Sequence, residues 1–63
     1  MDASDVLIDE LDKKVEQLKD WLVTGVATDY SEYKKVCGEV RGLLIARGYI
    51  LDLKQKMENS DNE

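Results

Sequence analysis

The chain has 63 residues with a net charge of −5, and it contains no histidine, no proline and one cysteine. These values exclude an intrachain disulfide, leave no usual ligand set for zinc, and argue against direct binding to a nucleic-acid backbone. A single domain of this size, 1–63, buries only about 60% of the surface of its unfolded chain, so contact with another protein is the remaining source of stability.

The first predicted element is a helix over residues 5–24. Ser4 is predicted to cap its N-terminus, and Gly25 is predicted to end it as the first residue beyond the C-terminal cap. Acidic residues in its first turns suit the positive end of the helix dipole. Its apolar residues step by three or four, as one face of an α-helix requires. These residues are Leu7, Leu11, Val15, Leu18 and Leu22.

The second predicted element is a helix over residues 29–57. The link 25–28 is short, which makes the two helices antiparallel neighbours. Asp29 followed by Glu32 resembles a capping box. A seven-residue repeat on one face, typical of a coiled-coil seam, is formed by Val36, Leu43, Ile50 and Met57. The predicted fold class is therefore all-α, an antiparallel two-helix hairpin completed by oligomerisation or by docking on a larger partner.

The two predicted helices differ in length, at about 30 Å and about 42 Å. Antiparallel pairing from the turn then leaves roughly the last two turns of the longer helix without a partner. Those turns hold Ile50, Leu51, Leu53 and Met57. The ends of the chain, 1–4 and 58–63, are predicted to be flexible.

The longer helix carries a second apolar face, opposite its seam. Small residues recur there at four-residue spacing and leave room for another backbone to approach closely. A hairpin partner covers only one face of a helix, so a second molecule is expected on this one. Alternatively, the glycines make room for a side chain within the hairpin, such as Trp21. The predicted protein interface consists of Gly38, Gly42, Ile45, Ala46, Tyr49, Ile50, Leu53 and Met57.

Arg47 lies within the main apolar stripe of the longer helix, seven residues after Val40. Two interpretations stay open. Its stem can lie on apolar surface while the guanidinium stays in water. Alternatively, Arg47 forms an interchain ion pair that sets the register of an assembly.

No catalytic set is predicted. Acid–base catalysis usually relies on histidine or on carboxylates held in a pocket, and a two-helix hairpin has no cavity of the size that small ligands use. Cys37 lies beside the apolar face, where a buried and unreactive thiol is expected. We therefore expect a protein that is not an enzyme and that binds no metal, cofactor or small molecule.

The run DYSEYKKVCGEVRGL, residues 29–43, resembles a stretch of the small helical accessory proteins encoded in head-assembly gene modules of tailed bacteriophages. The shared features are an Asp-Tyr-x-Glu-Tyr helix start, then a glycine, then Arg-Gly-Leu. The resemblance is confined to this segment and carries over no catalytic or ligand residue. It implies a virion or head-assembly component that contacts itself or a larger phage protein such as capsid or portal.

Two functions are compatible with these features. The leading hypothesis is a structural or assembly protein that acts through helix-mediated contacts. The alternative is a small acidic phage regulator that binds a host nucleic-acid-binding enzyme. Its carboxylates would be Asp2, Asp5, Asp9, Glu10 and Asp12.

The expected location is the cytoplasm of the bacterial host, the virion, or both. The first 20 residues are densely charged, unlike a secretory signal peptide. No apolar run approaches the roughly 20 residues that span a bilayer. The chain is therefore expected to be neither secreted nor membrane-spanning.

Overall fold

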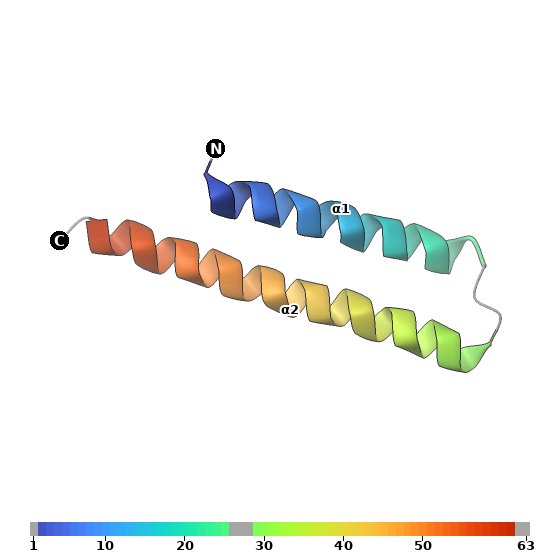
Figure 1. The fold of residues 1–63 in the computed structure, drawn as a ribbon. Coiled ribbons are helices and arrows are strands. Elements are labelled where there is room, and N and C mark those ends of the chain that lie inside the picture. The colour runs from blue at the N-terminus through green and yellow to red at the C-terminus, as the bar shows by residue number, and fades with distance from the viewer. Residues whose placement is uncertain (1, 26–28, 62–63) are drawn as a thin grey trace.

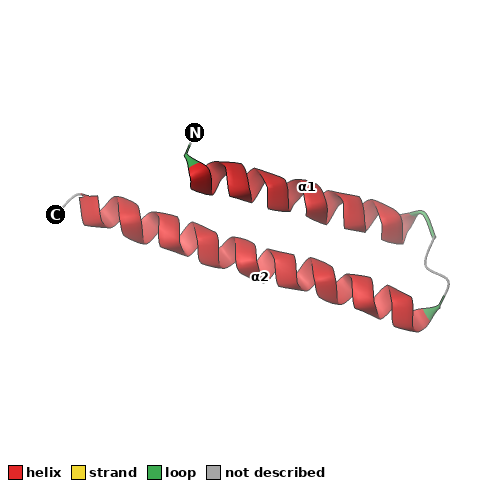
Figure 2. Ribbon diagram, in the orientation of Figure 1, coloured by secondary structure: helices red, strands yellow, loops and turns green. Residues whose placement is uncertain are grey.

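The computed structural model describes residues 2–25 and 29–61. It contains two helices, α1 (Ala3–Val23) and α2 (Tyr30–Asp61). They lie side by side and antiparallel, with the start of α1 and the end of α2 toward the same end of the molecule (Figure 1). The described residues form helices and connecting loop only, without a strand (Figure 2). The predicted all-α hairpin is thereby confirmed.

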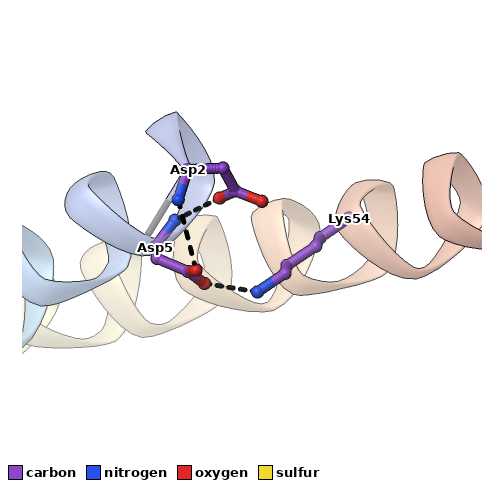
Figure 3. Close-up of polar contacts among 3 residues, drawn as sticks. All are labelled: Asp2, Asp5 and Lys54. Carbon is purple, nitrogen blue, oxygen red and sulfur yellow. Dashed lines mark hydrogen bonds and ion pairs between the residues drawn. The ribbon is translucent and has the colours of Figure 1, made fainter.

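The N-terminus of α1 is capped by Asp2. The Asp2 carboxylate accepts a hydrogen bond from the Asp5 backbone N–H at 2.9 Å, and the Asp2 backbone N–H donates to the Asp5 carboxylate at 3.5 Å (Figure 3). This reciprocal capping box satisfies N–H groups that have no partner inside the helix. The prediction of Ser4 as the cap is wrong, because Asp2 performs that function two residues earlier and Ser4 is helical.

The C-terminus of α1 is closed by Gly25, as predicted. Its φ of +73° lies in the left-handed region, and its N–H donates to the Leu22 carbonyl at 3.4 Å. The Thr24 hydroxyl donates to the Trp21 carbonyl at 3.0 Å. These bonds satisfy carbonyls at the end of the helix. The rest of the predicted link, residues 26–28, lies outside the described residues.

The start of α2 is capped by Asp29, as predicted, since its carboxylate accepts the Glu32 backbone N–H at 2.8 Å. The helix continues to Asp61, beyond the predicted end near residue 57. No glycine or proline follows Gly48, so nothing in the local sequence stops the helix earlier.

The core between the helices is small. Among the described residues only Val15 and Val36 are buried hydrophobics, at 4% and 8% exposure. The side of α2 that faces α1, here called the seam, is otherwise half-buried. The seam consists of Val36, Val40, Leu43, Arg47, Ile50 and Lys54. Two of its six positions are cations, so the hairpin has little apolar area with which to stabilise itself.

The part of α2 that extends beyond α1 begins later in the chain than predicted. Lys54 contacts Asp5, which places this part of α2 opposite the first turns of α1. Ile50 and Leu51 are half-buried, so the prediction that they lack a partner is wrong. The reason is that α1 begins at residue 3 and covers more of α2. Met57, the last residue of the predicted repeat, is 59% exposed and lies outside the seam.

Replacing glycine with alanine should change the stability of the hairpin in opposite directions at Gly48 and at Gly25. A Cβ at Gly48 meets nothing within 4 Å, so Gly48→Ala should stabilise the hairpin by about 1 kcal/mol through helix propensity. Gly25→Ala should destabilise it by about 1–2 kcal/mol, because its φ is positive. Thermal unfolding followed by far-ultraviolet circular dichroism measures both. A lowered midpoint for Gly48→Ala would contradict the open surroundings of that residue.

Candidate protein-protein interface

The predicted interface residues divide into two groups. Ala46 and Ile50 are half-buried and lie beside or within the seam, so they serve the hairpin itself. The others are exposed, and the large ones range from 49% exposure at Ile45 to 73% at Tyr49. The exposed members are Gly38, Gly42, Ile45, Tyr49, Leu53 and Met57.

Five of these exposed residues form a continuous stripe along α2. At 100° per residue they lie within about 80° of one another, and roughly 100–180° from the direction of the seam. They therefore point away from α1. We call this surface the outer stripe, and its members are Gly38, Gly42, Ile45, Tyr49 and Leu53.

The glycines of the outer stripe do not make room within the hairpin. A Cβ built at Gly38 or Gly42 meets no atom within 4 Å. The interpretation that they accommodate Trp21 is therefore wrong. Each glycine costs the helix about 1 kcal/mol against alanine, and no contact inside the described chain offsets that cost.

A shallow depression of about 450 Å³ adjoins the outer stripe. The missing side chain of Gly48 opens space between the larger residues one turn before and after it. The lining residues all belong to α2, so the depression stays open to solvent and does not enclose a small molecule. They are Ile45, Gly48, Tyr49, Leu51, Asp52 and Gln55.

Two ion pairs between described residues connect α1 to α2. Arg47 Nε donates to Asp12 Oδ1 at 2.7 Å, and Lys54 Nζ contacts Asp5 Oδ1 (Figure 3). The two acids are seven residues apart on α1, and the two cations are seven residues apart on α2. Both pairs therefore fit one antiparallel register, and a shift of either helix along its axis would separate both.

Arg47 pairs within its own chain, which corrects the interpretation of an interchain ion pair. Its side chain is 35% exposed. Its ion pair can therefore set the axial register between α1 and α2 of one chain. The residues that sequence reasoning missed are Asp5, Asp12 and Lys54, although opposite charges at seven-residue spacing on the facing sides of both helices were a usable signal.

The acidic residues of segment 2–12 each have a partner within the chain. Asp9 and Glu10 contact Lys13 at 3.1 and 3.6 Å. Asp2 caps α1, and the remaining two acids form the pairs across the hairpin. This segment is therefore less available to a basic partner than its composition indicates.

The Asp5–Lys54 pair predicts how stability depends on pH. Their hydrogen bond lowers the pKa of the Asp5 carboxyl below its ordinary 3.8 and raises the pKa of the Lys54 ammonium above its ordinary 10.5. A depressed carboxyl pKa stabilises the fold above the unfolded pKa, and this contribution is lost as pH falls through the folded pKa. A raised ammonium pKa stabilises the fold below 10.5, and this contribution is lost as pH rises through the folded pKa.

The free energy of unfolding should therefore decline on both sides of a plateau that lies between about pH 4 and pH 10. Denaturant unfolding across this range measures it. Lys54→Met removes the partner, so it should flatten both flanks of the profile. An unchanged profile in Lys54→Met would contradict the assigned pair.

Cys37 is a free thiol and is half-buried, less than predicted, because it lies at the edge of the seam. Its hydrogen bond with Tyr33 raises the pKa of that phenol. Within residues 2–25 and 29–61, no three acidic, thiol or imidazole groups gather as metal ligands would. Neither helix of that part combines the length and the apolar character needed to cross a bilayer.

No family model, curated protein or solved structure matches the chain. The candidate interface therefore rests on the geometry of the hairpin itself.

Proposed function

We propose that the protein is a non-enzymatic structural or assembly protein that acts through contacts along the outer stripe of α2. The observation that carries the proposal is the exposure of Ile45, Tyr49 and Leu53, at 49%, 73% and 56%. Three large apolar side chains on one side of one helix form an exposed patch of the kind that marks protein interfaces.

The energetics of the hairpin support the same function. Fully burying a large apolar side chain contributes about 1.5–3 kcal/mol. Ile45, Tyr49 and Leu53 are already partly covered, so covering the rest of their surface would contribute about 3–5 kcal/mol, close to the lower end of the stability of a small domain. A partner on this surface would stabilise the folded chain and would also join it to an assembly.

Within this class we propose a virion or head-assembly component of a tailed bacteriophage, found in the host cytoplasm, in the virion, or in both. This narrower assignment rests on the resemblance of residues 29–43. Its partners are further copies of the chain or a larger phage protein such as capsid or portal, and no direct contact with nucleic acid or membrane is proposed.

An acidic regulator of a host enzyme takes second place. Such a regulator needs carboxylates that are free to meet a basic surface. The carboxylates of segment 2–12 are engaged within the chain, which favours the assembly function over this alternative.

The test is a triple variant of the outer stripe, Ile45→Gln with Tyr49→Gln and Leu53→Gln. None of these residues faces α1, so the hairpin should fold. We expect the wild-type chain to co-purify with virions or head intermediates, and the triple variant to be lost from them. The matched control is Val6→Gln with Val23→Gln and Leu44→Gln, since these apolar residues are similarly exposed but lie off the outer stripe.

Equal retention of the triple variant and the wild type would contradict the assembly function. A partner that binds both equally but dissociates as salt concentration rises would favour the acidic regulator, because exposed charges are screened.

A further inference from the structure

We propose that the outer stripe of α2 binds the outer stripe of a second copy of the chain, with the two α2 helices antiparallel and related by a two-fold axis. The inference rests on the proposed function, because it names the occupant of the same surface. The two-fold axis passes between Ile45 and Ala46, at the middle of the outer stripe.

The sizes of the residues along the outer stripe reverse about this centre. The N-terminal half is small, with Gly38 and Gly42, and the C-terminal half is large, with Tyr49 and Leu53. An antiparallel pairing about the centre therefore places Gly42 opposite Tyr49 of the partner subunit. By the same symmetry it places Gly38 opposite Leu53 of the partner subunit.

A large side chain opposite a glycine fills the space that the glycine leaves, which permits close approach at protein-like packing density. A parallel pairing would instead put tyrosine against tyrosine at one end and glycine against glycine at the other. That arrangement is crowded at one end and leaves a void at the other. The order of residue sizes therefore selects the antiparallel two-fold arrangement, and it accounts for glycines that have no neighbour in the single chain.

The exposed area of the chain matches what a second copy would cover. The chain exposes 5019 Å². A compact monomer of 7.2 kDa exposes about 4,100 Å², so the excess is about 900 Å². Each partner in a standard protein interface buries about 800 Å². One further copy along the 53 Å length of the hairpin thus suffices to bring burial to the ordinary value.

Charges beside the outer stripe fit the same pairing. Arg41 is exposed and forms no ion pair with any other described residue. Among the described residues, the only ion-pair partner of Asp52 is Lys56 of its own helix, at 3.4 Å. Helical periodicity puts Arg41 and Asp52 on the same flank of the outer stripe. In the antiparallel pairing, Arg41 and Asp52 of the partner subunit differ by only about 3 Å in position along the helix axis. Two such pairs would form per dimer.

The decisive variant is Gly42→Leu. In the single chain it meets open space and improves helix propensity, so the hairpin should be at least as stable as the wild type. In the dimer it collides with Tyr49 of the partner subunit. Sedimentation equilibrium of the full chain should show the wild type as a dimer, and Gly42→Leu should raise the dimer dissociation constant about tenfold or more.

The matched control is Gly48→Leu, which makes the same chemical change on α2 at an open position beside the outer stripe, where no partner side chain is placed opposite it. It should raise the dissociation constant less than Gly42→Leu does. Adding Tyr49→Ala to Gly42→Leu should restore the dimer, because the vacated space receives the new leucine. Arg41→Asp and Asp52→Arg should each weaken self-association, and an equimolar mixture of these two variants should form a heterodimer.

A wild-type chain that stays a monomer at all concentrations overturns this inference, and so does an equal effect of Gly42→Leu and Gly48→Leu. If the wild type is monomeric while the glutamine triple variant is lost from particles, the assembly function stands with a larger partner and only the inference fails. If the dimer forms as described while that variant is retained in particles, the inference stands and the assembly function fails.

Discussion

Replacing Val15 with aspartate should unfold the hairpin. Val15 is 4% exposed and is one of only two buried hydrophobic residues among those described. An ionised carboxylate at this position would lose its hydration without gaining a partner, which costs several kcal/mol. The small core offers little stability against that cost. Most of the stability of a helix in a protein comes from packing of its apolar face, so most helical structure should be lost with the hairpin.

Far-ultraviolet circular dichroism and thermal unfolding measure this outcome. We expect Val15→Asp to lose most of its helical signal and its cooperative transition. The matched control is Val6→Asp, the same substitution in the same helix at a residue that is 48% exposed. It should change stability by no more than about 1 kcal/mol. A cooperative transition in Val15→Asp at the wild-type midpoint would show that Val15 does not hold the helices together.

Reversing the charge at Arg47 should destabilise the hairpin by about 2 kcal/mol. Arg47→Asp removes a 2.7 Å charge-assisted hydrogen bond and puts a second carboxylate beside Asp12. The estimate allows for solvent screening, because both side chains are partly exposed. Combining Arg47→Asp with Asp12→Arg should recover most of the loss, since the pair is restored in reverse.

A double-mutant cycle on denaturant unfolding isolates this pairwise energy. Lys56→Asp is a suitable comparison, because Lys56 forms an exposed pair with Asp52 inside α2 and not between the helices. It should cost only about 0.5 kcal/mol. If Arg47→Asp costs no more than Lys56→Asp, or if the swapped double variant is no better than either single one, the Asp12–Arg47 pair does not set the register.

The local features of the chain were predictable from neighbouring residues. Gly25 ends α1 and Asp29 begins α2 because caps satisfy backbone groups within one turn, and that need depends on few residues. The wrong prediction of Ser4 shows the limit, because Asp2 and Ser4 lie within one turn and both are residue types that commonly cap helices. The end of α2 was also predicted imprecisely. The helix extends to residue 61 because the sequence has no stop signal near the predicted end.

The two-sided character of α2 also follows from sequence. Periodicity assigns each side chain an angle around its own helix axis, so the sequence alone separates the outer stripe from the seam. Exposure of Ile45, Tyr49 and Leu53 then follows, because a single neighbouring helix covers one face only.

Periodicity does not determine how far one helix is shifted along the other. That axial shift depends on contacts between residues far apart in the chain, here Asp5 with Lys54 and Asp12 with Arg47. The observed axial shift places Ile50 beside α1, which leaves Ile50 half-buried. The same contacts give Arg47 a partner on α1, whereas the sequence left open whether its guanidinium stays in water or pairs with another chain. The open space around Gly38 and Gly42 was likewise visible only in three dimensions, because it depends on where α1 is absent.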